Sequence, residues 1–291
     1  MLVALFGVAI HAQTLAFSFD DGLDPRTQPQ AAAWNRAMLD ALAKANVKAI
    51  LFPAGRVVDS ADGMALVTAW GDAGHAIGNH SYAHGNFGSP RVSLATFIAD
   101  VQRADALYKA LPGWTPLVRF PYLKEGETAE KRDGFRAWMK ANGYRGAPVS
   151  IETSDWYYSS RFVAWREKNP DAEVKPYREA YLAHLWDRAQ HYDAEARALV
   201  GRSPKHMLLL HTNAINAAFI GDVIAMFRSK GWRIVAPAEA FADPLYASTP
   251  DTLPAGESIV WALAKQRGAS GLRYPAEDGV YEKPLLDKLG L

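Results

Sequence analysis

The stretch Ala16-Phe17-Ser18-Phe19-Asp20-Asp21-Gly22 carries the pattern from which the fold and the functional site are predicted. Apolar residues at alternate positions indicate a buried strand, which ends in two adjacent carboxylates before a glycine changes the chain direction. Two neighbouring carboxylates repel each other unless a cation neutralises one and leaves the other free to accept a proton. We therefore interpret Asp20-Asp21 as a base beside a metal ligand.

The composition excludes several classes of protein. The 291 residues carry 32 Lys and Arg against 31 Asp and Glu, a formal charge of +1, which predicts no surface for nucleic acid or an acidic membrane. The absence of cysteine excludes disulfides and cysteine nucleophiles, so any metal must be held by histidines and carboxylates. No apolar run reaches the roughly 18 to 20 residues that a membrane span needs. The composition leaves the oligomeric state unspecified.

The beginning of the chain is apolar. Residues 2–10 resemble the hydrophobic part of a signal peptide, although the basic residues that precede it in such peptides are lacking. We interpret residues 1–13 as a signal peptide or an apolar N-terminal arm. A signal peptide predicts a periplasmic or secreted protein, whereas an arm leaves a cytoplasmic location open.

Short apolar runs alternate with amphipathic stretches along the chain. We expect strands at 15–19, 47–52, 75–79, 117–120, 144–151, 207–211 and 232–235. We expect helices between them, at 29–45, 60–73, 94–111, 128–141, 176–200 and 216–230. Seven strands that alternate with helices predict a parallel α/β barrel. An open doubly wound sheet is the alternative, and no glycine-rich nucleotide-binding motif follows any strand.

Two further regions extend this pattern. Residues 157–203 are long for one connection between strands and predict a helical insertion packed over one mouth of the barrel. The aromatic residues of the insertion either line a carbohydrate groove or pack its helices, and they include Tyr157, Tyr158, Trp165 and Trp186. Residues 243–291 predict a C-terminal extension packed on the barrel, with one helix at about 257–267.

A pair of histidines follows the third expected strand. If His80 and His84 lie on one helical turn, both imidazoles share a face and can bind one metal ion. Together with Asp21, they would form an Asp-His-His set that leaves coordination positions open for water and substrate. Without the acidic pair, the two histidines would fit equally well as solvated or core residues.

Three later strands end in residues that can complete a site. Arg119 can keep a carboxylate ionised, or it can form a salt bridge at the rim. Asp155 and Trp156 place a carboxylate and an indole after the fifth strand. The apolar run 207–210 ends in His211, a position that taken alone is more typical of a core histidine.

Five short motifs, in this order, carry a resemblance to a known family. Asp20-Asp21, His80-Ser81-x-x-His84, Arg119-x-Pro121-Tyr122, Asp155-Trp156 and Leu208-Leu209-Leu210-His211 are similar to the motifs of the NodB-like polysaccharide deacetylases, carbohydrate esterase family 4. The resemblance covers residues 14–242, apart from most of the insertion. It implies a distorted (β/α)7 barrel of the NodB homology type.

The resemblance also implies roles for individual residues. Asp20 would be the general base, oriented by Arg119, and His211 would be the general acid, tuned by Asp155. The metal ligands would be Asp21, His80 and His84. The backbone N–H of Tyr122 would help hold the oxyanion, and the acetyl methyl group would be walled by Trp156 and by Leu209 or Leu210.

The implied cofactor is one divalent metal ion, Zn²⁺ first, with Co²⁺, Ni²⁺ and Mn²⁺ as alternatives. The implied reaction is hydrolysis of N-acetyl groups, which are linear amides, on an acetylated amino-sugar polymer or oligomer of the chitin or peptidoglycan type. Three alternatives stay open. These are a same-fold amidohydrolase for a small amide or cyclic imide, an O-acetyl xylan esterase, and a non-catalytic carbohydrate-binding module.

Overall fold

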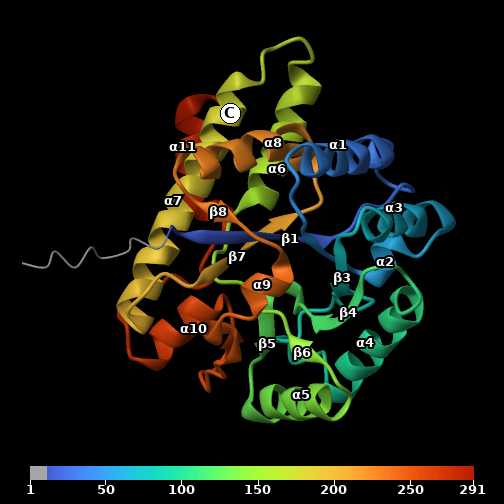
Figure 1. Cartoon of the computed structure of the whole chain (residues 1–291), viewed down its shortest axis with the longest axis vertical. Helices are drawn as coiled ribbons and strands as arrows, with labels where there is room; N and C mark the ends of the chain where they lie inside the picture. The colour runs from blue at the N-terminus through green and yellow to red at the C-terminus, as the bar shows by residue number, and fades with distance from the viewer. Residues whose placement is uncertain (1–11) are drawn as a thin grey trace, which may run out of the picture.

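A computed structural model describes residues 12–291 of the chain (Figure 1). The interpretation of residues 1–13 therefore falls almost entirely outside the described residues. The centre of the molecule is a parallel sheet in the order β6-β4-β3-β2-β1-β7, with β8 paired to the beginning of β1. Its strands are β1 (Thr14–Asp21), β2 (Ile50–Pro53), β3 (Ala76–Asn79), β4 (Trp114–Val118), β6 (Arg145–Gly146), β7 (Lys205–His211) and β8 (Arg233–Ile234).

The segment that follows β6 joins the two ends of this sheet. β6 pairs with β4 at Val118, and five residues after Gly146 the backbone of Ile151 forms a parallel bridge to Leu208 of β7. The N–H of Leu209 donates to the carbonyl of Ile151 at 3.0 Å. The sheet therefore curls into a distorted barrel, as predicted, and each of the seven expected strands is present.

Alternating side chains of the strands form two cores. Because successive residues of a strand point to opposite faces, Ala16 and Met207 lie in the barrel interior with Phe52 and Leu117. Their neighbours in β1 and β7 point outward and pack against the surrounding helices; these outward residues are Phe17, Phe19, Leu208 and Leu210. The apolar pattern of both strands is continuous because both of their faces are buried.

Most of the expected helices surround the barrel. They are α1 (Ala31–Lys44), α3 (Ala61–Asp72), α4 (Leu94–Tyr108), α5 (Ala129–Ala141) and α8 (Ala214–Ser229). Two short helices that the sequence did not predict, α2 (Gly55–Val58) and α9 (Pro237–Phe241), lie among them. Four of these helices begin at a side-chain cap that accepts a hydrogen bond from a backbone N–H of the first turn: Ser60, Ser93, Thr128 and Asn213. Caps of this type define where the helices start.

The insertion forms α6 (Asp155–Lys168) and α7 (Lys175–Val200), which lie beside α8 in the outer layer of helices (Figure 1). The prediction that the insertion covers a mouth of the barrel is therefore wrong. Its aromatic residues pack the helices: Tyr158 is fully buried, Trp165 lies against Tyr177, and Trp186 lies against Trp232. Of the two interpretations of these aromatic residues, helix packing accounts for their positions, because they belong to the core outside β1 and β7.

The C-terminal extension packs on the barrel. It consists of a 3₁₀ turn η2 (Pro244–Ala247), β9 (Ala255–Gly256), α10 (Ile259–Gln266) and α11 (Gly279–Leu289). β9 pairs antiparallel with β5 (Lys124–Gly126), which follows the turn η1 (Pro121–Leu123). The N–H of Ile259 donates to the carbonyl of Val149 at 2.8 Å. The sequence did not predict α11, because Pro284 lies inside it.

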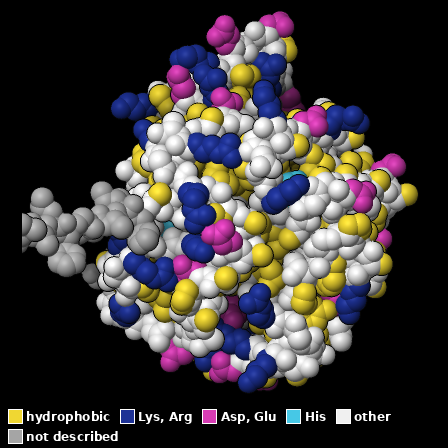
Figure 2. All heavy atoms as spheres, viewed as in Figure 1, with side chains coloured by type: hydrophobic (Ala, Val, Ile, Leu, Met, Phe, Trp, Pro, Cys, Tyr) yellow, Lys and Arg dark blue, Asp and Glu magenta, His cyan; other side chains and the backbone are white. Residues whose placement is uncertain are grey.

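The surface matches the near-neutral composition. Figure 2 shows basic and acidic side chains intermixed over the visible face, with hydrophobic side chains between them. Among residues 12–291, no helix combines the length and the apolar character needed to cross a membrane.

Candidate active site

The carboxyl ends of the parallel strands bring the predicted residues to one mouth of the barrel. β1 ends in Asp20-Asp21, and β7 ends in His211, which lies in register with Asp20. His80 follows β3, and Arg119 follows β4. Because ligands in parallel α/β folds bind at this end of the strands, the position of these residues is itself typical of an active site.

Asp21, His80 and His84 form a cluster whose ligand atoms all lie within 4.8 Å of one another. The Nε2 atoms of His84 and His80 lie 3.0 and 3.5 Å from Oδ1 of Asp21. That oxygen is buried and has no hydrogen-bond partner within the described part of the chain. A divalent cation would satisfy it, so these three side chains fit a metal ion.

The orientation of His80 supports this reading. Its Nδ1 lies 2.8 Å from the backbone carbonyl of Arg119, an acceptor that requires Nδ1 to carry the proton. The lone pair of Nε2 then faces Asp21, which is the arrangement usual for histidines that bind metals.

The two histidines meet in a loop and not on a helical turn, so the predicted conformation of this segment is wrong. Ser81 and His84 have φ angles of 60° and 54°, in the left-handed region. The carboxylate of Asp100 on α4 accepts hydrogen bonds from the N–H groups of Tyr82 and Ala83 and fixes the loop. The two imidazoles thus lie close enough to share a metal ion because of the shape of this loop and not because of helical periodicity.

Asp20 is only 2% exposed and is held by Arg119. Nη1 of the arginine donates to both carboxylate oxygens, at 3.0 and 3.1 Å. The guanidinium is itself fixed, because Nε donates to the carbonyl of Ala147 at 2.6 Å and the group lies over the ring of Phe52. Arg119 is therefore a buried partner of Asp20 and not a salt bridge at the rim.

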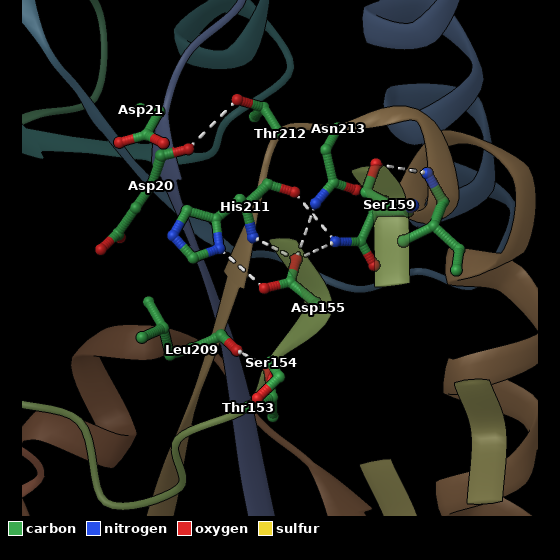
Figure 3. A network of polar contacts seen from close by, with 12 residues as sticks. Asp20, Asp21, Thr153, Ser154, Asp155, Ser159, Leu209, His211, Thr212 and Asn213 are labelled. Carbon is green, nitrogen blue, oxygen red and sulfur yellow. Dashed lines mark hydrogen bonds and ion pairs between the residues drawn. The ribbon is translucent and has the colours of Figure 1, made fainter. Parts of the chain in front are cut away.

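His211 lies on β7, the strand next to that of Asp20, and is held by Asp155, the first residue of α6 (Figure 3). Nδ1 of His211 lies 2.7 Å from Oδ1 of Asp155. Burial alone would lower the pKa of His211, but the carboxylate of Asp155, with smaller contributions from the Asp20-Asp21 pair, raises that pKa to about 10. His211 is thus a cation in the metal-free protein, able to donate a proton.

Burial would likewise raise the pKa of Asp21. The imidazoles of His80 and His84 and the charge of His211 have the opposite effect and hold the pKa of Asp21 well below its usual range. Asp21 is therefore ionised over the working range of pH, as a metal ligand must be.

Two asparagines that the sequence analysis missed complete the acid side. The second oxygen of Asp155 accepts hydrogen bonds from Asn213 and Asn216 at 2.9 and 2.8 Å, and from the N–H of His211 at 2.8 Å. Asn213 was detectable as the cap that begins α8. Asn216 carries no sequence signal, because its role depends on how α8 packs against α6.

The predicted substrate-binding residues separate into two groups. Tyr122 and Trp156 are 58% and 44% exposed, so both are available to a ligand at the surface. Leu209 lies in the barrel interior, on the same face of β7 as His211. Leu210 is fully buried in the outer core, where a substrate at the mouth cannot contact it, and its assignment as a wall residue is wrong.

Several non-glycine residues at the mouth have strained backbone. Asp21, Ser81, His84, Tyr122 and Leu123 have φ angles between 54° and 79°. A residue with a Cβ rarely adopts this conformation, and such strain gathers at functional sites where the surrounding structure holds it.

Comparisons with known proteins agree with this geometry. Residues 8–146 match the family model described as polysaccharide deacetylase. This part of the chain is similar to the polysaccharide deacetylases. The match includes the three candidate metal ligands, Asp20 and Arg119, and it ends before Asp155 and His211. The pairing of Asp155 with His211 is therefore known from the structure and not from this match.

Relatives of the chain include a peptidoglycan-N-acetylglucosamine deacetylase of Bacillus cereus. The two are 29% identical over 143 residues, which are 49% of this chain and 46% of that protein. The matched region thus spans less than half of the length of that curated relative.

Solved structures share the fold at low sequence identity. A family 4 carbohydrate esterase from Streptomyces lividans in complex with acetate has a TM-score of 0.51 at 21% identity, covering 78% of this chain and 95% of that one. A polysaccharide deacetylase from Bacillus cereus has a TM-score of 0.55 at 19% identity, covering 77% and 91%. A mutant of a carbohydrate esterase family 4 pseudoenzyme also has a TM-score of 0.55, at 16% identity, covering 79% and 67%. The fold therefore does not decide activity, and the site residues must.

Proposed function

We propose that the chain is a metal-dependent hydrolase that removes N-acetyl groups from an amino-sugar polymer or oligomer of the chitin or peptidoglycan type. One observation carries the proposal. One mouth of the barrel holds three groups together. They are a set of side chains that fits a metal ion, the Asp20 carboxylate held by Arg119, and the cationic His211 held by Asp155. Metal-assisted hydrolysis of an amide can use these three functions together.

Asp21, His80 and His84 would hold the metal ion, with Zn²⁺ first and Co²⁺, Ni²⁺ and Mn²⁺ as alternatives. When bound, a divalent ion lowers the pKa of a water molecule and stabilises negative charge on oxygen. Oxygen and imidazole ligands suit several of these ions, so Zn²⁺ is placed first because of the family resemblance and not because of the donor set.

The residues of the chain supply the proton transfers. A carboxylate oxygen of Asp20 accepts the proton of the attacking water, and the hydrogen bonds from Arg119 hold the carboxylate in position for this role. Nε2–H of His211 then donates a proton to the departing nitrogen, which leaves as an amine while acetate is released. Asp155 holds the imidazole by Nδ1 throughout.

The remaining residues position the acetyl group. The backbone N–H of Tyr122 serves as a donor to the oxyanion. Tyr122 has a strained left-handed backbone, which sets the orientation of this N–H group. Leu209 and Trp156 wall the methyl group, one from the barrel interior and one from the surface. An amino-sugar substrate is supported by the name of the Bacillus cereus relative. We further propose that the protein is exported, on the basis of the apolar beginning of the chain.

Acetate release from the acetylated substrates and ring opening of a cyclic imide together test the proposal. The purified protein is incubated with N-acetylated chitooligosaccharide, peptidoglycan, acetylated xylan and a small cyclic imide, before and after treatment with a chelator and addition of metal. We expect acetate from an amino-sugar substrate, loss of activity with the chelator and recovery with metal. Faster turnover of xylan or of the imide would favour the esterase or the small-amide hydrolase instead.

Complete inactivity with stoichiometric bound metal would favour a non-catalytic binding module. That alternative deserves a test because a family pseudoenzyme shares the fold. The buried pairing of Asp20 with Arg119 argues against it, since a binding module has no need to bury a carboxylate and a guanidinium beside a second carboxylate.

A further inference from the structure

A cavity of about 570 Å³ lies apart from the candidate metal site. It opens between α5, β6 and the C-terminal extension, around the strands that Figure 1 shows between α5 and α10. None of the proposed metal ligands lines it, and neither Asp20 nor His211 does. Its volume falls within the roughly 300 to 1,000 Å³ that is typical of small-molecule sites.

The interior of the cavity is apolar. Its walls include Leu117 and Phe241 from the barrel interior, Met139 of α5, and Ile259 and Ala262 of α10. These side chains are buried, so the cavity reaches into the core. A polysaccharide would bury its hydroxyl groups here without partners, which is unfavourable. The cavity is therefore suited to an apolar group and not to the proposed substrate.

The few polar groups inside the cavity already have partners. The hydroxyl of Tyr246 lies 3.0 Å from the hydroxyl of Ser150 and 3.0 Å from the carbonyl of Lys205. The hydroxyl of Tyr144 donates to Asp105. The interior thus offers an incoming ligand mainly van der Waals contact.

The charged residues that line the cavity leave a positive rim. Glu125 is paired with Arg136 by two hydrogen bonds, at 2.6 and 2.8 Å, and Glu257 is paired with Lys124. Lys140 and Arg145 are exposed and form no ion pair with any described residue. Two uncompensated cations therefore stand at the entrance to an apolar interior.

We propose that this cavity binds an amphipathic anion, a small molecule with an apolar body and a single carboxylate or phosphate group. The apolar body would fill the space between α5 and α10, and the anionic group would remain at the entrance beside Lys140 and Arg145. The proposal goes beyond deacetylation, because the cavity shares only Arg119 with the candidate active site.

Calorimetric titration of the whole protein tests the proposal, with a chelator present so that the result is independent of catalysis. The probes are decanoate, decyl phosphate, the neutral decan-1-ol and acetate. We expect decanoate and decyl phosphate to bind with one-to-one stoichiometry and decan-1-ol to bind roughly threefold to tenfold more weakly, because it lacks the charge. Acetate should give no saturable heat, since it has no apolar body.

Two variants locate the binding. Thr252→Trp places an indole at the partly buried wall of the cavity and should abolish saturable binding, while the thermal unfolding midpoint reports whether the variant folds. The double variant Lys140→Glu with Arg145→Glu alters exposed positions and should reduce decanoate affinity at least to that of decan-1-ol.

The matched control is Arg36→Glu with Lys44→Glu, which reverses one exposed arginine and one exposed lysine on α1 and should leave binding unchanged. The proposal is overturned if decan-1-ol binds as tightly as decanoate, or if the Lys140 and Arg145 variant binds like the unaltered protein. Many decanoate molecules bound per chain would overturn it too, since that is detergent-like adsorption and not a site.

Discussion

On the metal side of the mouth, His80 places Nδ1 2.8 Å from the carbonyl of Arg119, whereas on the acid side His211 places Nδ1 2.7 Å from the carboxylate of Asp155. A neutral carbonyl leaves an imidazole free to present a lone pair, but a carboxylate stabilises the imidazolium. The same side chain is thus suited to bind a metal ion at His80 and to donate a proton at His211. The partner of Nδ1 makes the difference.

A third buried histidine extends the comparison. Nδ1 of His75 accepts a hydrogen bond from the N–H of Ala49 at 3.0 Å. Burial, with a smaller contribution from the charge of Lys48, lowers the pKa of His75 to about 4. An N–H donor can be accepted only by an unprotonated nitrogen, so this histidine stays neutral. A carbonyl, a carboxylate and an N–H group next to Nδ1 therefore favour three different protonation states of histidine.

The largest expected effects separate the base from the metal ligand. Asp20→Asn removes the proton acceptor and should lower kcat by roughly 10³-fold or more. It should leave the metal bound, because Asp21, His80 and His84 are intact. His80→Ala should lose both activity and metal. Acetate release and elemental analysis of the bound metal distinguish the two variants, and equal metal loss in both would contradict this division of roles.

Asp155→Asn should make His211 resemble His80, because Nδ1 of His211 would then face a neutral oxygen in place of a carboxylate. The amide cannot stabilise the imidazolium, so the pKa of His211 should fall from its raised value, and kcat should drop by roughly 10²-fold. The protonated acid is then lost at lower pH, and the alkaline limb of the pH–rate profile moves down. NMR titration of His211 in the metal-free protein measures the shift, with Asn213→Ala as a milder control. An unchanged pKa would show that Asp155 does not tune His211.

His75→Gln should reduce the loss of unfolding free energy that the protein shows as the pH falls. Between pH 6.5 and about 4 the unfolded chain binds a proton that the folded His75 excludes, so stability falls as pH falls through this window. The loss amounts to about 2 kcal/mol in the unaltered protein. Urea unfolding at pH 7 and pH 4.5 should show a smaller difference for the glutamine variant. An identical difference would mean that other groups dominate the acid response.

Trp156→Ala should have the smallest effect. The exposed indole lies next to Asp155 but takes no part in its hydrogen bonds, so KM should rise about threefold to tenfold with little change in kcat. The pKa of His211 should stay unchanged, which distinguishes a wall residue from a tuning residue. Trp165→Ala, in the packed part of the same helix, is the control and should leave KM unaltered.

The sequence predicted features that depend on neighbouring residues, and it missed features that depend on how distant elements pack. Asp20-Asp21 was detectable because an apolar strand runs directly into the acids, and the seven strands followed from the same alternation. The left-handed conformation of the loop that holds His84 was not detectable, since the residues that adopt it, Ser81 and His84, are not glycines. Leu209 and Leu210 are equivalent as a sequence, and only pairing of β7 inside a barrel decides which one faces inward.

The cavity beside α5 had no sequence signal at all. Its walls come from β4, α5, β6 and the C-terminal extension, and each contributes apolar residues that look like ordinary core positions. Asn216 was undetectable for the same reason, because its contact with Asp155 joins two helices that lie far apart in the chain.

The left-handed residues at the mouth have a consequence for the evolution of stability in this protein. Tyr122 and Leu123, at φ 56°, each hold a conformation that glycine adopts with less strain. Replacing either by glycine would relieve that strain in the folded state, yet it would also release a segment that borders the proposed oxyanion position. Selection for heat resistance alone would therefore act against the arrangement needed for turnover, so these positions mark a trade-off between durability and rate.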